Sequence, residues 1–339
     1  MKQKKDVRLS DIAKKLGIST VTVSKALSDK EGVGEDLRRE IKTLAQEMRY
    51  KPVKSSSRLK NGITGNIGIV IPSRFFTPNY SFYWYLFTHL SSALLKQNFF
   101  SMMELLSPED EKKCTPPRLI SENKVDGVVF LGQTSTEYIE MINSYYSNFI
   151  LMDFYTPNPD LDCVVNDDFF NSYLITSYLI SKGHKKMRFV GNFDATSSIR
   201  DRFMGFQKAM YENGLSANLD DIILDRGEDG LLIQMELPPR KDLPTAFVCN
   251  SDLTASRLIA RLKENGIKVP DDISVTGYDN FLSEKEEKTI PLTTICVEAE
   301  DICTLAAELI ISKVTGKPYI KGRHLVSGKI IVRESVSSI

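Results

Sequence analysis

The sequence has few of the residues that hold metals or form disulfides. Its five cysteines are scattered without any C-x-x-C pair, and its three histidines lie far apart along the 339 residues. A disulfide framework or a zinc site needs such residues at close spacing, so we expect free thiols, no metal site and little scope for histidine-based catalysis. The cysteines are Cys114, Cys163, Cys249, Cys296 and Cys303, and the histidines are His89, His184 and His324.

Long apolar runs and enzyme signatures are also missing. No stretch approaches the roughly 18 apolar residues of a membrane span, and the basic start of the chain leads into an amphipathic pattern rather than a signal-peptide core. We therefore expect a cytoplasmic protein. The motifs G-x-x-x-x-G-K-[ST], H-E-x-x-H and G-x-S-x-G do not occur, and the nearest glycine spacing, Gly62, Gly65 and Gly68, precedes a strand instead of following one. These absences predict a protein that is not an enzyme and needs no cofactor.

Charge is unevenly distributed along the chain. Lys and Arg together number 44, as do Asp and Glu, so the formal net charge is zero. Residues 1–64, however, hold sixteen basic against eight acidic side chains, which leaves the remainder acidic. A basic head is what phosphate contacts with DNA require, although an ordinary solvated basic face has the same composition.

Residues 9–27 predict two short helices joined by a tight turn. Ser10 is a candidate N-cap of the first helix, Gly17 ends it, and Ser19 is a candidate N-cap of the second. A third helix is expected from about residue 35 to residue 49. This is the pattern of a DNA-reading helix-turn-helix, with a three-helix cap that binds no nucleic acid as the alternative. The apolar stripe of the first helix consists of Leu9, Ile12, Ala13 and Leu16, and the second helix turns Val23 and Leu27 inward.

From Asn66 onward, short apolar segments alternate with helical ones, which is typical of parallel sheets covered by helices on both faces. The strands are too many for one comfortable sheet. We therefore expect two doubly wound sheets in series, with a ligand cleft at the carboxyl ends of their strands. The expected strands are 66–72, 99–105, 125–132, 149–154, 162–166, 186–191, 245–250 and 273–279, and the expected helices are 83–97, 169–181, 199–213 and 255–264.

Several motifs are linked in one order along essentially the whole chain. They are LSDIAKKLGISTVTVSKAL, VDGVVFLG, DDFFNSYLITSYLISKGHKK, Arg202 with Gly205 and Phe206, VPDDISVTGYDN and PLTTI. With these motifs the chain resembles the LacI/GalR family of bacterial transcription regulators. The resemblance implies an N-terminal all-α helix-turn-helix DNA-binding domain and an α/β two-lobed, periplasmic-binding-protein-like core. It also implies a dimer that binds a near-palindromic operator and a small-molecule ligand that changes DNA affinity.

This organisation predicts a DNA-binding domain at residues 1–53, a hinge or linker at 54–64 and an effector-binding, dimerisation core at 65–339. Within the core, we expect an N-subdomain at about 65–165 plus 292–326 and a C-subdomain at about 166–291 plus 327–339. The linker is serine-rich and basic. The resemblance implies that it folds on DNA into a hinge helix whose Leu59 enters the minor groove beside the basic Arg58, with a plain linker as the alternative.

The resemblance also assigns the DNA-reading residues of the second helix. It places Thr20, Val21 and Lys25 at the bases, and Thr22 and Ser24 at phosphates. The chemistry is suitable, because lysine donates to guanine O6 and N7 and the methyl groups of Thr and Val meet the thymine methyl in the major groove. The DNA-binding residues expected are Ser19, Thr20, Val21, Thr22, Ser24, Lys25, Arg58 and Leu59.

Five residues carry the expectation of a sugar-like ligand. Asp279, Arg202 and Asp153 lie where members of the family hydrogen-bond ligand hydroxyls or carboxylates, and an arginine fork opposite an aspartate acceptor grips a polyol or a sugar acid from both sides. Phe82 and Tyr83 offer rings that stack on a sugar, or else belong to the core. Further candidates are Asn250, Ser251, Asp252 and Asp167, with helix capping competing for Asp252 and a strand-to-helix turn for Asp167.

We therefore expect a dimeric, ligand-responsive repressor of carbohydrate-utilisation genes that binds a palindromic operator. The alternatives are a regulator answering to a non-sugar metabolite, a two-lobed α/β enzyme and a solute-binding receptor. An inducing and a corepressing ligand are equally compatible with the sequence.

Overall fold

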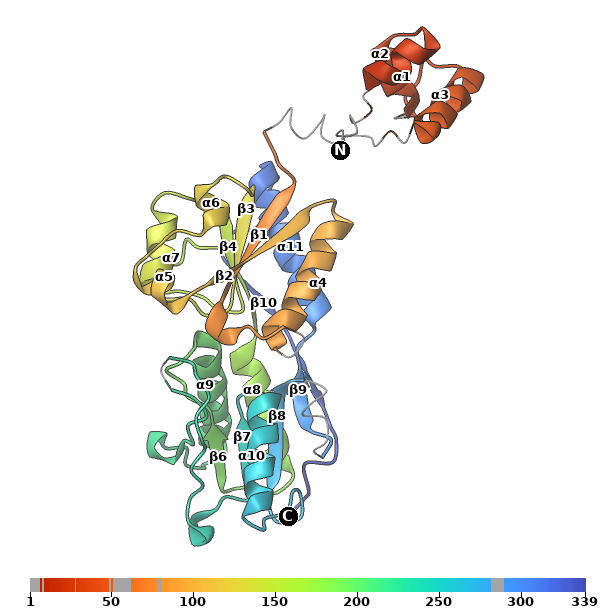
Figure 1. Ribbon diagram of the computed structural model, residues 1–339. Helices are drawn as coiled ribbons and strands as arrows, with labels where there is room; N and C mark the ends of the chain where they lie inside the picture. Colours follow the sequence, from red (N-terminus) through yellow and green to blue (C-terminus); the bar gives the residue numbers. More distant parts are fainter. Residues whose placement is uncertain are drawn as a thin grey trace. The chain divides into compact units, whose positions relative to one another are not determined.

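The computed structural model describes residues 7, 9–27, 29–48, 50, 62–78, 81–227, 229–281 and 290–339. The chain divides into two compact units, residues 1–62 and residues 63–339. Figure 1 shows the two units, with the first in red and the second running from orange to blue.

The first unit is a small bundle of helices around one apolar core. It contains α1 (Leu9–Leu16), α2 (Thr20–Leu27) and α3 (Glu35–Glu47). The predicted stripes are confirmed, because Ile12, Val23 and Ile41 are fully buried together. Ser19 caps α2 as predicted, since its Oγ accepts a hydrogen bond from the Thr22 N–H at 3.1 Å. The prediction for Ser10 is wrong, because α1 already begins at Leu9 and Ser10 lies inside it.

The second unit consists of two lobes, and the first lobe is built on a parallel sheet of the order β10-β5-β4-β3-β1-β2. α4 (Phe82–Lys96) and α11 (Ala299–Thr315) pack on one face, while α6 (Arg118–Ser121) and α7 (Thr136–Asn143) pack on the other. Alternating residues of each strand supply the two cores, as in β1, where Ile69 faces one and Val70 the other. The strands are β1 (Asn66–Pro72), β2 (Phe100–Leu106), β3 (Gly127–Leu131), β4 (Phe149–Met152), β5 (Cys163–Asn166) and β10 (Arg323–Val326), and α5 (Pro108–Lys112) follows β2.

The second lobe repeats this layering on a sheet of the order β11-β9-β8-β7-β6. α8 (Asp168–Ser181) and α9 (Ser197–Glu212) cover one face, and α10 (Asp252–Glu264) covers the other. All neighbouring strands are parallel except β11, which is antiparallel to β9. The strands are β6 (Met187–Val190), β7 (Ala246–Cys249), β8 (Ser274–Asp279), β9 (Thr293–Cys296) and β11 (Lys329–Ile331).

The predicted fold class is confirmed, but one subdomain boundary is wrong. The prediction places residues 292–326 in the N-subdomain, whereas β9 pairs with β8 and β11 in the second sheet. After the second lobe, the chain returns to the first lobe only beyond β9, where α11 begins. A short buried strand has the same apolar composition in either sheet, so its sequence does not reveal which sheet it joins.

No helix in the described ranges is both long and apolar enough to cross a membrane. Among the same residues, no group of three or more His, Cys, Asp and Glu side chains is arranged to hold a metal ion. The five cysteines are free thiols.

Candidate functional site

A cavity of about 410 Å³ is lined by residues of both lobes. Its walls come mainly from segments that follow parallel strands, namely the turn after β1 and the residues after β4, β7 and β8. This is where open parallel sheets bind ligands. The lining consists of Arg74, Phe75, Thr77, Ser81, Phe82, Tyr83, Asp153, Thr196, Ser198, Ile199, Arg202, Arg226, Gly230, Leu232, Asn250, Ser251, Leu253, Asp279 and Phe281.

Two aspartates reach the cavity from opposite lobes in the same backbone setting. Asp153 directly follows β4, and Asp279 ends β8. Both have positive φ, 66° for Asp153 and 100° for Asp279, a region that side-chain-bearing residues seldom occupy. Strained backbone of this kind is concentrated at binding sites, where the surrounding structure holds a side chain in one direction.

The Asp279 carboxyl is buried and poorly satisfied. Its Oδ1 has no hydrogen-bond partner and lies 3.6 Å from an Arg202 guanidinium nitrogen. Burial is the main reason that the pKa of Asp279 lies well above its usual range, with the Arg202 charge opposing the shift. A buried acceptor without a donor is a place where a ligand hydroxyl or N–H gains a hydrogen bond.

Arg202, on α9, lines the cavity and is buried. Its Nε donates to Asp168 Oδ1 at 2.7 Å, and its guanidinium stacks 3.7 Å from the centre of the Tyr278 ring. Burial disfavours the guanidinium charge, but the carboxylates of Asp168 and Asp279 outweigh burial and raise the pKa of Arg202. Arg202 is therefore a permanently charged and rigidly held donor, not a side chain free to follow a ligand.

Asp153 is held by neutral donors. Its carboxylate accepts hydrogen bonds from the Tyr83 hydroxyl at 2.9 Å and from the Asn166 amide at 3.4 Å. Burial, followed by the nearby Asp168 charge, raises the pKa of Asp153 from 3.8 to about 6.

The raised pKa of Asp153 predicts a pH-dependent stability difference. Protonation stabilises the folded state of the wild type fully below the unfolded pKa of 3.8, and this contribution is lost as the pH rises through about 6. Asparagine has the size and backbone tolerance of aspartate without the charge, so Asp153→Asn should be more stable than wild type at pH 7 by on the order of 1–2 kcal/mol. Thermal unfolding at pH 4 to pH 8 measures the difference, which should shrink towards acid pH. An equal difference at both ends of this range contradicts the prediction, and Asp160→Asn on the exposed surface is the control.

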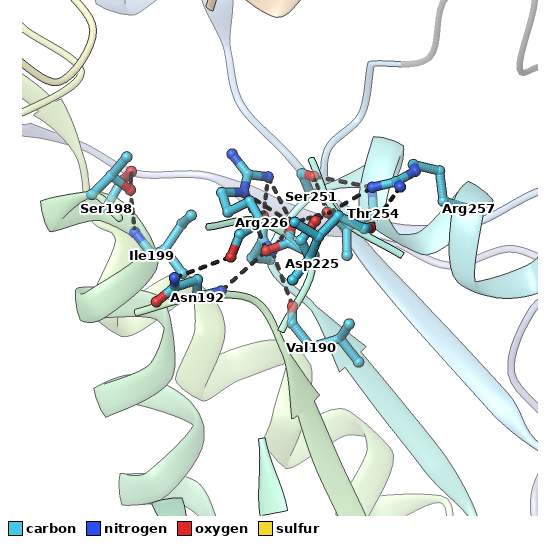
Figure 2. A network of polar contacts seen from close by, with 12 residues as sticks. Val190, Asn192, Ser198, Ile199, Asp225, Arg226, Ser251, Thr254 and Arg257 are labelled. Atoms are coloured by element: carbon cyan, nitrogen blue, oxygen red, sulfur yellow. Dashed lines mark hydrogen bonds and ion pairs between the residues drawn. The ribbon is translucent and has the colours of Figure 1, made fainter. Parts of the chain in front are cut away.

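A second polar network supports the opposite wall of the cavity. Asp225 is fully buried and accepts hydrogen bonds from Arg226 at 2.8 Å, from the Asn250 amide at 2.9 Å and from the Thr254 hydroxyl at 2.7 Å. Burial alone would raise the pKa of Asp225, but the Arg226 charge and these hydrogen bonds together lower it. Figure 2 shows Arg226 and Thr254 directed at this carboxylate, while Ser251 donates a hydrogen bond to the Thr254 hydroxyl at 3.0 Å. Asp225 thereby orients Arg226 and Asn250 at the cavity.

Aromatic rings form much of the remaining wall. Phe75 and Tyr83 stack with ring centres 5.3 Å apart, and Phe82 contacts Phe281 across the two lobes at 5.9 Å. These four rings come from the turn after β1, the first turn of α4 and the end of β8. They present apolar faces to a bound ring.

Polar contacts also join the two lobes beside the cavity. Ser197, the first residue of α9, donates its N–H to Gln133 Oε1 of the first lobe at 2.9 Å. One turn later, Asp201 accepts hydrogen bonds from the Tyr155 hydroxyl at 2.8 Å and from Arg323 at 3.1 Å. Because Arg202 follows Asp201 on the same helix, α9 carries both a residue of the cavity and one of these interlobe contacts.

The structure brings seven of the nine predicted effector residues to the cavity and leaves two away from it. Asp167 caps α8 by accepting from the Phe170 N–H at 3.2 Å, and it does not line the cavity. Asp252 lies behind the wall, where it accepts from Thr294 and from the Phe281 N–H. The structure does not bring these two aspartates to the cavity, and an aspartate at the start of a helix has the same sequence pattern whichever way its side chain points. The seven at the cavity are Phe82, Tyr83, Asp153, Arg202, Asn250, Ser251 and Asp279.

Sequence reasoning missed several residues of the lining. Arg74 and Phe75 follow β1, so their place at a strand end was a usable signal. Phe281 lies two residues after Asp279 and carried the same signal. Arg226 and Leu232 lie in an irregular stretch of the second lobe, where no periodicity indicates which side chains turn inward.

The predicted DNA-reading surface of α2 is exposed. Thr20, Val21, Ser24 and Lys25 are exposed and Thr22 is half-buried, and Val21 retains 63% of its accessible surface. A single exposed apolar side chain is common on protein surfaces, so the exposure of Val21 is compatible with the predicted base contact and does not test it. Arg58 and Leu59, predicted to contact DNA from the hinge, lie outside the described residues.

Comparison with known proteins identifies the chain. Residues 8–53 match the family described as bacterial regulatory proteins, lacI family, and residues 176–336 match the periplasmic binding protein-like domain. A relative of Vibrio campbellii, the HTH-type transcriptional repressor PurR, is 26% identical over 335 residues, which cover 98% of this chain and 99% of the relative. The chain belongs to the LacI family of bacterial regulatory proteins.

Solved structures share the fold of this LacI-family chain. The lac repressor dimer bound to operator and the anti-inducer ONPF aligns over 98% of this chain and all of its own, with a TM-score of 0.78 at 18% identity. The complex of the transcriptional regulator CelR with cellobiose aligns over 97% of this chain and 99% of its own, with a TM-score of 0.68 at 19% identity. These two structures show that the fold is shared. The match to the lacI family of bacterial regulatory proteins and the relatives named as transcriptional repressors show a regulator and not an enzyme.

Proposed function

We propose that this LacI-family chain is a dimeric repressor that binds a palindromic operator. Its affinity for the operator decreases or increases when a small molecule occupies the interlobe cavity. The observation that carries the proposal is the cavity itself, into which each lobe projects one strained, buried aspartate. A relative named as a transcriptional repressor and a structural neighbour bound to both operator and a small molecule support it.

The effector is a small, ring-shaped and hydroxyl-bearing molecule such as a sugar. The carboxyls of Asp153 and Asp279 accept from hydroxyl groups, Arg202 lies between them, and the aromatic wall covers a ring face. The volume of about 410 Å³ accommodates a molecule of the size of a sugar or a nucleobase. A nucleobase-like metabolite is the alternative effector, since the aromatic rings of the wall also stack on flat rings.

An exposed apolar edge on the first lobe supports dimerisation. β2 lies at the edge of its sheet, and Phe100, Met103 and Leu105 along it are exposed, with Phe100 keeping 63% of its accessible surface. Leu95 at the end of α4 is exposed as well. An open strand edge with large apolar side chains is unfavourable in water, and a two-fold related copy removes both the edge and the apolar surface from solvent.

The coupling between effector and operator follows from linkage. A ligand that touches Asp153 and Asp279 binds the two lobes at once, so it favours one angle between them over another. In a dimer that angle changes the separation of the two DNA-binding units, and the ligand's preference for one state sets the size of the response.

Two measurements test the proposal together. Selection from a random DNA library with the full chain should yield a palindromic sequence. Fluorescence anisotropy on that sequence then measures operator affinity in the presence of sugars, sugar derivatives and nucleobases, one compound at a time. We expect at least one compound to change operator affinity by about tenfold or more. A chain that selects no sequence, or that turns over a compound without binding DNA, is not this repressor.

Lys25→Ala tests the reading surface. Lys25 is exposed on α2, and loss of its donor to a guanine should weaken binding to the selected operator by about 1–3 kcal/mol and relax specificity at one base position. Anisotropy titrations on the operator and on single-base variants measure both effects.

Lys15→Ala is the matched control, because Lys15 is an exposed lysine on α1, outside the reading helix. It should weaken binding to operator and random DNA by the same factor, as loss of one charge near the phosphates does. If Lys25→Ala behaves in this way too, Lys25 contacts phosphate and the base-reading assignment is wrong.

A further inference from the structure

The three arginines that line the cavity are neutralised within the protein. Each forms an ion pair with its own buried carboxylate behind the wall, so their charges are already balanced before a ligand enters. The pairs are Arg74 with Glu111, Arg202 with Asp168, and Arg226 with Asp225.

Two carboxyls at the cavity have no arginine of their own. Asp153 is bonded only by neutral groups, and Asp279 has as its nearest cation Arg202, which is already paired at 2.7 Å with Asp168. A third carboxyl, Asp252, lies buried behind Asp279 and has no ion pair among the described residues. The site therefore carries an excess of acidic groups over cations in a poorly solvated space.

The aromatic wall is also suited to a cation. Phe75, Phe82, Tyr83 and Phe281 all line the cavity beside these carboxyls. The faces of aromatic rings carry partial negative charge, and rings grouped with carboxylates are the usual surroundings of a bound ammonium group.

Three helix N-termini also face the cavity, and they favour anions. α4, α9 and α10 begin there, and each contributes only about half a positive charge, which fades within the first turn. Their first free N–H groups are already capped by Ser81, Thr196 and Ser251. The partial positive charges of these helix N-termini reduce the excess of carboxyl groups over cations at the cavity but do not reverse it.

We propose that the effector is a small ring compound that carries a protonated amine, with the ammonium group held by Asp153 and Asp279 against the aromatic wall. This inference rests on the proposed function, because it names the chemical class of the ligand of the same cavity. The same carboxyls disfavour a ligand whose main charge is a carboxylate or a phosphate.

Two matched series of compounds test the charge preference on the full chain. Glucosamine, glucose and glucuronate share one skeleton, and tyramine, tyrosol and 4-hydroxyphenylacetate share another. Isothermal titration calorimetry at pH 7 should show, in at least one series, that the amine binds about tenfold or more tightly than the alcohol and that the acid binds weakest. An acid that binds tightest in its series overturns the inference.

Charge-neutral variants identify the groups responsible. Asp153→Asn and Asp279→Asn keep the size of each side chain, and either should reduce the advantage of the amine over the alcohol to less than about threefold. Lys317→Ala on the exposed surface is the control and should leave the ranking unchanged. An amine advantage that persists in both variants overturns the inference.

The experiments distinguish a failure of the amine inference from a failure of the proposed repressor function. If the operator screen identifies an effector without an amine, the inference is wrong and the repressor remains. If the chain selects no operator, the proposed function is wrong whatever the calorimetry shows.

Discussion

Asp279→Ala should abolish the response of operator binding to the effector while leaving operator affinity nearly unchanged. The buried Oδ1 of Asp279 has no hydrogen-bond partner in the protein, so a ligand donor that meets it satisfies a buried acceptor. Removal of the carboxyl should weaken effector binding by about 100-fold or more, since it truncates one member of a buried charged contact. Operator affinity without effector depends on the DNA-binding unit and on the proposed dimer surface along β2, and Asp279, at the end of β8, belongs to neither.

Anisotropy titration of the operator at increasing effector concentration measures this prediction. Asp279→Asn should retain part of the response, because its amide oxygen still accepts a hydrogen bond. Asp271→Ala, at an exposed acidic position of the same lobe, is the control and should respond as the wild type does. A normal effector response in Asp279→Ala shows that the effector binds elsewhere.

Gly205→Ala should destabilise the effector-binding unit by about 3–4 kcal/mol, a large effect for one methyl group. Gly205 lies where α9 crosses α8, and a Cβ at this position would lie 2.0 Å from the Phe169 carbonyl oxygen. The obstructing atom is backbone in a packed helix, so the two helices must separate to admit the methyl group. The intrinsic preference of alanine for helices, worth about 1 kcal/mol, opposes the effect and is too small to offset it.

Thermal or urea unfolding of the full chain measures the loss, and the transition of the second unit is the one that should shift. Met204→Ala, at the exposed neighbouring position of the same helix, should change stability by less than about 0.5 kcal/mol. If Gly205→Ala unfolds at the wild-type midpoint, α8 and α9 are not packed as closely as the structure has them.

The helix-turn-helix was predictable nearly to the residue because its signals are local. The i, i+3, i+4 spacing of Leu9, Ile12 and Ala13 and the cap at Ser19 each depend on neighbours within one or two turns. The alternation of strands and helices in the core was predictable for the same reason. The first helical position of α1 was not, since Leu9 and Ser10 are both compatible with a helix start.

The cavity was predictable only in part. Strand-end residues such as Asp153 and Asp279 could be named because the carboxyl edge of a parallel sheet is where ligands bind. Whether a given polar residue there faces the cavity or bonds within the protein depends on the direction of its side chain, and Asp167 and Asp252 bond within the protein away from the cavity. Arg226 gave no local signal at all.

The sequence by itself determined the class of protein. Local sequence patterns are enough to indicate a basic helix-turn-helix, two α/β lobes and the linked motifs of the LacI family. Tertiary structure alone decided which strand joins which sheet, which arginines are neutralised by which carboxylates, and that Asp153 and Asp279 from opposite lobes share one cavity. The reason is physical, because periodicity and capping act between neighbours in the chain, whereas charge balance and burial are set by residues far apart along it.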